Sequence, residues 1–212
     1  MSRFTGFSLV VLALSMLIGS APRALADVVF EPYAGYETAT SSIGVSINPV
    51  TAPLGGTIQS SLSGIDVGAR LGIHSGHFFL DVDYSYGSLN SNVTSEPTGF
   101  TQSGGGVTRS TLGADLGART GFLKLFVGYD FLNDWDFKAT GTQTSDLTFH
   151  GTGLHAGLGI RLFSRIHLNA EYRLSTFTKY SQSGDFDLSS INTYDSGTAS
   201  SFIFTLSCPL RL

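Results

Sequence analysis

The side chains of this chain most able to do chemistry are charged, and they fall on one face of segments in which apolar and polar residues alternate. They carry both signs, and they are Glu31, Asp66, Arg70, Asp81, Asp83, Asp115, Arg119, Lys124, Asp130, Arg161, Glu171, Arg173 and Arg211. Enclosed together, such residues form a network of ion pairs, because an unpaired buried charge is very costly. The alternative is a narrow ion path, in which switching of the pairs opens a file of water.

Hydrolysis is the second chemistry to consider, and it needs a nucleophile, a base and an orienting carboxylate. His150 is the histidine best placed for it, with many serines in the neighbouring segments. No His-x-Ser spacing with a partner carboxylate accompanies it, so we do not expect an enzyme. His155 and His167 fall on the charged face and are expected to join the ion-pair network.

Other candidate sites are weaker. The glycines of Gly151-Thr152-Gly153 open a strand rather than a helix, so the helix N-terminus of a phosphate loop is lacking. Trp135 is expected to be an aromatic anchor at a membrane interface. Cys208 is the only cysteine, so there is no internal disulfide, and it is expected to face lipid. No metal-ligand spacing or cofactor motif stands out, and we expect neither.

The elements that position these residues are β-strands. From Leu154 to Leu162 every second residue is apolar, and the pattern restarts from Ile166 to Leu174. A period of two indicates strands. Eight such strands are expected, at about 28–38, 64–73, 78–87, 112–119, 123–131, 154–162, 166–175 and 202–212. Short turns alternate with long polar loops, which are expected at 40–63, 88–108, 133–149 and 179–199, although Ile43, Val45 and Ile47 weakly continue the alternation.

The faces of these strands indicate the environment. One face is wholly apolar and the other mixes glycine with charge, so the apolar face must meet lipid. Eight strands make the smallest usual closed barrel, whose lumen side chains can fill. Closure leaves no unpaired strand edge in lipid. The sequence therefore predicts an all-β fold: a closed eight-stranded antiparallel up-and-down transmembrane barrel.

Turn chemistry permits a prediction of register. A two-residue turn at Ser75-Gly76 sets Arg70 opposite Asp81, and a turn at Thr120-Gly121 sets Gly117 opposite Lys124. Three residues at 163–165 set Gly157 opposite Glu171, Gly159 opposite Asn169 and His155 opposite Arg173. Glycine would thus face a large side chain repeatedly, as packing inside a narrow barrel requires.

The N-terminus resembles a targeting segment. A short basic region and the apolar run 7–18 precede Ala24-Leu25-Ala26, which fits the rule for signal-peptide cleavage. We expect residues 1–26 to be a cleaved signal peptide and 27–212 to be the barrel domain. Removing Arg3 and Arg23 with that segment leaves ten basic and 16 acidic residues, a net charge of −6. Such an acidic balance argues against nucleic acid as a partner.

With these residues in view, the chain resembles the small bacterial outer-membrane β-barrels of the OmpA transmembrane-domain and opacity-protein type. The resemblance rests on the signal peptide, the eight alternating strands and the short-turn, long-loop asymmetry. It implies a place in the outer membrane, with periplasmic turns, extracellular loops and a role in envelope structure and surface contact. It implies outer-membrane lipid and lipopolysaccharide, the barrel-assembly machinery, and an extracellular ligand or host surface as partners. Leu212 departs from the aromatic final residue usual in such proteins.

Three other functions remain open at this stage. A small passive, porin-like pore would use the charged face as an ion path. A lipid A-modifying enzyme would use His150 at the outer rim. A soluble lipocalin-like binder would require the apolar faces to point inward around a ligand.

Overall fold

The fold is a barrel of long antiparallel strands. The computed structural model describes residues 26–47, 54–96, 100–138, 146–183 and 192–212. Residues 1–25 of the expected signal peptide therefore lie outside the described residues, and Ala26 is the first residue of β1. The strands are β1 (Ala26–Ile47), β2 (Leu54–Ser75), β3 (Phe78–Glu96), β4 (Phe100–Arg119), β5 (Leu123–Phe137), β6 (Asp146–Arg161), β7 (His167–Ser183), β8 (Asn192–Ser207) and β9 (Leu210–Arg211).

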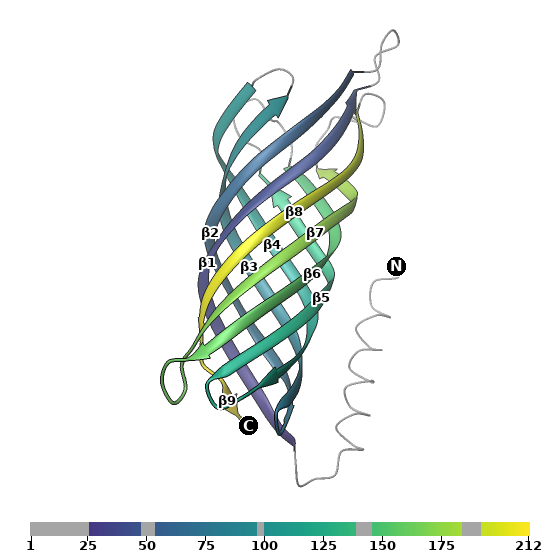
Figure 1. Cartoon of the computed structure of the whole chain (residues 1–212). Coiled ribbons are helices and arrows are strands. Elements are labelled where there is room, and N and C mark those ends of the chain that lie inside the picture. The colour runs from purple at the N-terminus through teal and green to yellow at the C-terminus, as the bar shows by residue number, and fades with distance from the viewer. Residues whose placement is uncertain (1–25, 48–53, 97–99, 139–145, 184–191) are drawn as a thin grey trace.

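Within the described residues, β1 to β8 are the eight strands of one closed sheet. Each strand pairs with the next along the chain, β8 pairs with β1, and the pairing of β1 with β2 closes the sheet (Figure 1). The two-residue β9 also pairs with β1 and continues β8 after an interruption at Pro209, which has no backbone N–H to donate. The closed wall leaves no edge unpaired, and the predicted fold class is confirmed.

The strands extend well beyond the predicted ends at one side of the barrel. A membrane-spanning strand needs about 9–11 residues, whereas β1 and β2 have 22 residues each and pair from Ala26–Ser75 to Ile47–Leu54. Much of each segment predicted to be a loop is therefore β-ladder, and those predictions were wrong. Serine- and threonine-rich sequence still pairs well in a ladder, because the hydrogen bonds are made by the backbone. We call this side the hairpin end and the opposite side, with Gly76, the turn end.

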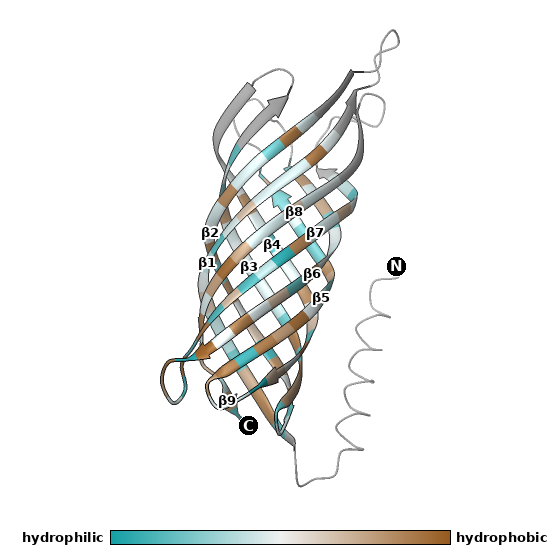
Figure 2. Cartoon of the chain, in the orientation of Figure 1, coloured by the Kyte–Doolittle hydropathy of each residue, from teal (hydrophilic) through white to brown (hydrophobic). Residues whose placement is uncertain are grey.

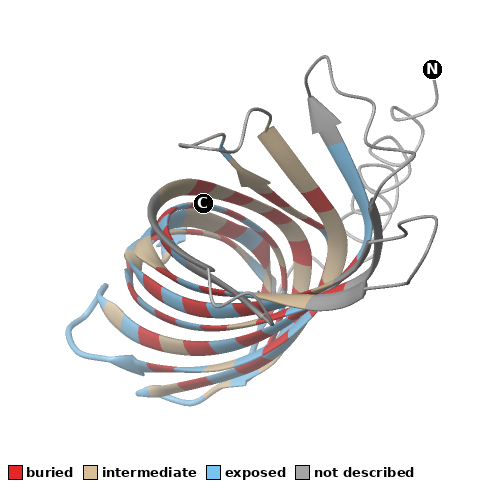
Figure 3. Cartoon of the chain, turned by 90° about the horizontal axis from the view of Figure 1, so that it is seen from above, coloured by how far each residue is buried: buried red, intermediate tan, exposed pale blue. Residues whose placement is uncertain are grey.

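The two faces of the wall are oriented as predicted. Val127 is 59% exposed and Leu158 is 43% exposed, whereas Arg70 is 1% exposed and Glu171 is 6% exposed. Hydrophobic and hydrophilic residues alternate along the strands (Figure 2), as do buried and exposed ones in the view down the barrel (Figure 3). In the middle of the barrel the apolar side chains are thus outside and the charges inside, which excludes the lipocalin-like arrangement. No helix among the described residues is long and apolar enough to cross a membrane.

The ladder has several register shifts near the hairpin end, and the bulges on β5 and β7 matter most for the side chains described below. On β5, Leu112 pairs with Leu132 while Gly113 pairs with Asp130, so Phe131 is an extra residue. On β7, the pairing skips from Phe177 to Lys179 opposite β6. A bulge inserts one residue and so moves everything beyond it to the other face. Phe131 was predicted to face outward like Val127 and Tyr129, but it is the bulged residue. Leu132, which unbroken alternation would turn inward, is 53% exposed.

One of the three predicted registers is confirmed. The pairs Gly157–Glu171, Gly159–Asn169 and His155–Arg173 are present as predicted. At the first turn Arg70 pairs with Asp83 instead, because Gly76 and His77 form the turn and Gly76 adopts a left-handed φ of 58°. Gly117 pairs with Phe126 rather than Lys124, because the second turn is two residues longer than predicted.

Inward glycines make room for large side chains. A Cβ on Gly128 would overlap the ring of His155, and one on Gly157 would overlap the ring of Phe126. These glycines therefore serve close packing across the lumen rather than turns. The predicted pairing of small with large residues holds, although several partners differ.

We predict that a charge on the apolar outer face destabilises the barrel. Val127→Arg is expected to lower the free energy of unfolding by about 2–4 kcal/mol, because it places a guanidinium in hydrocarbon. Ser88→Arg is the control: this exposed residue of β3 lies nearer the hairpin end, and its expected cost is about 0–1 kcal/mol. Urea unfolding in lipid vesicles, followed by fluorescence of the only tryptophan, Trp135, measures both. Equal costs would show that Val127 does not face lipid.

Candidate functional site

The candidate site is the charged lattice in the middle of the lumen, and Arg70 on β2 is its hub. Its Nε lies 3.0 Å from Asp115 Oδ2 and its Nη2 lies 3.1 Å from Glu171 Oε2. Asp83 and Glu31 approach the same guanidinium at 3.5 and 3.7 Å. One cation from β2 thus faces carboxylates from four other strands, which ties the wall together across the lumen.

A second cation, Arg173 on β7, extends the lattice. Its Nη2 lies 2.6 Å from Glu171 Oε1, and its Nε lies 3.4 Å from Asp130 Oδ2. His155 lies between two carboxylates, 2.6 Å from Asp115 and 3.4 Å from Asp130. The prediction that His155 joins the network is therefore met by this geometry.

Nearer the hairpin end, Arg109 on β4 extends the lattice, since Arg109 and Arg173 both donate to Ser85 Oγ, and the sequence analysis did not predict it. Its Nη2 lies 2.6 Å from Asp66 Oδ1 and 3.2 Å from Glu37 Oε2, and the exposed fraction of each of these side chains is 1% or less. The sequence did not indicate Arg109, because it directly follows the segment 88–108 that was predicted to be a loop. Glu37 was not among the predicted charged residues either.

Nearer the turn end, Lys124 on β5 donates to Glu31 Oε2 at 2.9 Å. His74 Nε2 lies 2.9 Å from Asp81 Oδ1, so His74 is a buried partner as well as a residue flanking the turn. The lattice therefore runs continuously from Glu31 through Arg70 to Arg173.

Three of the predicted lattice residues lie elsewhere. Arg119 and Arg161 make no ion pair among the described residues, and Arg211 makes an exposed one with Asp27 at 3.4 Å. All three line a cavity of about 370 Å³ at the turn end, together with His167. They sit at the mouth because their strands end there, beyond the reach of the buried carboxylates.

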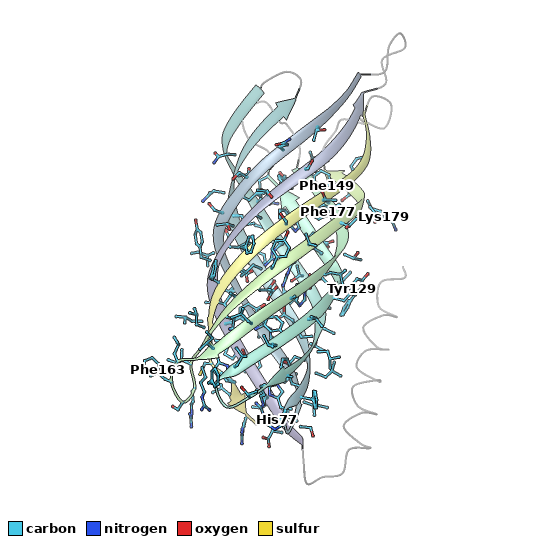
Figure 4. All side chains as sticks on the ribbon, viewed as in Figure 1. His77, Tyr129, Phe149, Phe163, Phe177 and Lys179 are labelled. Carbon is cyan, nitrogen blue, oxygen red and sulfur yellow. The ribbon has the colours of Figure 1, made fainter. Side chains whose placement is uncertain are left out.

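An apolar cluster fills the lumen above the lattice at the hairpin end, and the sequence did not predict it. Its buried members are Ala39, Ile43, Leu62, Leu89, Val107, Trp135, Phe149, Phe177 and Ala199. The ring centroids of Trp135 and Phe177 are 5.6 Å apart, and Phe149 and Phe177 lie close together inside the wall in Figure 4. Trp135 is fully buried, so its prediction as an interfacial anchor was wrong: the bulge at Phe131 turns it inward.

The buried cations offset part of the carboxylate charge in the lumen, and the side chains fill its cross-section. Among the described residues, eight buried carboxylates lie near four buried Lys and Arg side chains, and His74 and His155 also contact them. The buried carboxylates are those of Glu31, Glu37, Asp66, Asp81, Asp83, Asp115, Asp130 and Glu171. Within the described residues, no group of three or more His, Cys, Asp or Glu is placed to hold a metal ion. Cys208 is free and half-buried.

A closed wall with an apolar exterior and a charged, packed lumen defines a small transmembrane β-barrel protein. The chain belongs to the family of the outer membrane protein beta-barrel domain, whose sequence model matches residues 10–207. The family is one of bacterial outer-membrane proteins.

Several solved structures are similar to this chain. The attachment invasion locus protein Ail of Yersinia pestis is 12% identical, with a TM-score of 0.50 over 87% of this chain and 99% of Ail. Neisserial surface protein A is 14% identical, with a TM-score of 0.40 over 83% and 97% of the two chains. The outer membrane protease OmpT of Escherichia coli is 8% identical, with a TM-score of 0.37 over 88% and 97%. At 12% identity the likeness to Ail extends to the fold alone. No curated protein sequence matches the chain.

We predict that the lattice depends on its hub. Arg70→Met should lower the free energy of unfolding by about 3–5 kcal/mol, because it leaves several buried carboxylates without their cation. Arg119→Met, at the turn end, should cost less than about 1 kcal/mol, since Arg119 has no ion pair among the described residues. Adding Glu171→Gln to Arg70→Met should recover part of the loss. Urea unfolding of the three variants measures this, and equal costs for Arg70→Met and Arg119→Met would exclude the hub role.

Proposed function

We propose that this protein is an envelope-structural barrel whose lumen is plugged and non-catalytic, and whose extended hairpins make contacts at the cell surface. The observation that carries the proposal is the two-tier filling of the lumen. Ion pairs occupy the middle and the apolar cluster around Trp135 occupies the hairpin end. A lumen built to conduct would need a continuous water path, and the apolar tier opposes one.

In this proposal the short turns face the periplasm and the hairpins face outward. The partners are outer-membrane lipid and lipopolysaccharide around the apolar wall, the assembly machinery during insertion, and an extracellular ligand or host surface at the hairpins. Length supports the last of these, because β1 and β2 continue for about twice the span that a membrane requires. A cleaved signal peptide at residues 1–26 would deliver the chain.

The second candidate is a small passive pore, and the balance of buried charge favours it in one respect. Among the described residues buried in the lumen, carboxylates outnumber Lys and Arg eight to four, so a path opened through the lattice would select cations. The apolar tier would have to move aside for such a path to reach the hairpin end.

Planar-bilayer recording tests the proposal. We expect no stepwise conductance from the wild-type barrel, because the lumen is filled. The positive control is the triple variant Arg70→Ala/Glu171→Ala/Trp135→Ala. It removes one charge of each sign from the lattice and opens the apolar cluster, so it should give intermittent cation-selective openings. Stepwise openings from the wild type would overturn the plugged lumen and favour the pore.

A further inference from the structure

Three side chains on the outer wall form a linked group that neither the lumen nor the surface role uses. His150 on β6 lies with its Nδ1 2.8 Å from Asp134 Oδ1 on β5. Its Nε2 lies 3.1 Å from Ser181 Oγ on β7. In the tautomer with the proton on Nδ1, His150 donates to Asp134 and accepts from Ser181. This is the order of carboxylate, imidazole and hydroxyl that activates a serine for attack on an acyl group.

Two of the barrel's register shifts, the bulges on β5 and β7, create this group. Continuing the alternation of β5 from Asp130 would turn Asp134 into the lumen, and the extra residue Phe131 turns it outward. The skipped residue between Phe177 and Lys179 does the same for Ser181 on β7. Bulges that re-aim side chains are enriched beside active sites. Two independent bulges thus bring a carboxylate and a hydroxyl to opposite sides of one imidazole.

The surroundings indicate the class of substrate. On the same three strands, the outward residues closer to the turn end include Leu132, Leu154 and Leu174, which are 53%, 62% and 51% exposed. The group therefore lies at the edge of the apolar wall, where a lipid's acyl chain ends and its polar part begins. Lys179 pairs with His150 across the ladder and is exposed, and in Figure 4 it projects from the outer wall. An ammonium there suits an anionic headgroup.

We propose that Asp134, His150 and Ser181 form a hydrolytic site on the outer wall that cleaves acyl esters of anionic membrane lipids. Ser181 Oγ bonds to the ester carbonyl carbon, the bond to the alkoxy oxygen breaks, and His150 carries the serine proton to the departing alcohol. Water then attacks the acyl-serine, which releases a fatty acid and restores the hydroxyl. Asp134 is a positioning residue that orients His150. This activity is separate from the plugged lumen and goes beyond the expectation, drawn from sequence, of a protein without catalysis.

Hydrolysis of chromogenic acyl esters by the full chain refolded in detergent tests the site. The wild type should hydrolyse long-chain p-nitrophenyl esters faster than the acetate, and a fluorophosphonate probe should label Ser181. Ser181→Ala and His150→Ala should each lower kcat on the order of 100-fold or more. Ser88→Ala, which changes an exposed serine elsewhere on the wall, should leave it unchanged. Heat-modifiable gel mobility verifies that each variant is folded.

Further arms separate the role of Asp134 and the source of the lipid. Asp134→Asn should lower kcat with KM unchanged, and Asp134→Glu should recover part of the rate. Fatty acid release from phosphatidylglycerol vesicles would identify a phospholipid substrate, whereas loss of an acyl chain from purified lipopolysaccharide would identify that lipid. The proposal is overturned if the folded wild type hydrolyses no ester faster than Ser181→Ala does, or if the probe leaves Ser181 unlabelled.

Discussion

A charge enclosed in a narrow protein wall must find its counter-charge within that wall. Around the middle of the barrel the outer surface is apolar, so the polar face of the alternating strands is directed inward there. Desolvated carboxylates then require cations at short range, and Arg70 supplies one to groups from four other strands. Strand register, the inward glycines and the large partners across the lumen all follow from making those approaches fit.

The lumen solves this packing problem in two ways along its axis. In the middle, long charged side chains fill the cross-section, and glycines such as Gly128 and Gly157 leave room for rings opposite. Towards the hairpin end, an apolar cluster takes over, in which Trp135 meets Phe177 edge to face and donates from its indole nitrogen to Asn133. The apolar cluster thus fills the lumen on the hairpin side of the lattice without adding carboxylates that would need cations. At the turn end, the arginines at the mouth border a cavity instead.

Irregularity of the ladder governs the outer rim. If the alternation of β5 and β7 were unbroken, the side chains of Asp134 and Ser181 would point into the lumen. The bulges on β5 and β7 break the alternation at neighbouring strands. They exchange the faces of the residues beyond them, so the same two defects place Trp135 in the plug and a hydrogen-bonded Asp-His-Ser group at the edge of the apolar wall. The inward position of Trp135 and the outward position of Asp134 therefore have the same structural cause, the bulge on β5.

The sequence by itself determined that there are eight strands in a barrel and which way their middle parts face, because a period of two with one apolar face is a local property. It also predicted ten of the residues gathered in the lattice, and it predicted the register at the turn where loop length was read correctly, Gly157 opposite Glu171. It failed at Arg70, whose partner depends on where Gly76 turns, and at Arg109, which lies in sequence that resembles a loop. Only the tertiary structure decided the inward place of Trp135 and the meeting of His150 with Ser181. A single inserted residue inverts every side chain beyond it, and that insertion is defined only against the neighbouring strand.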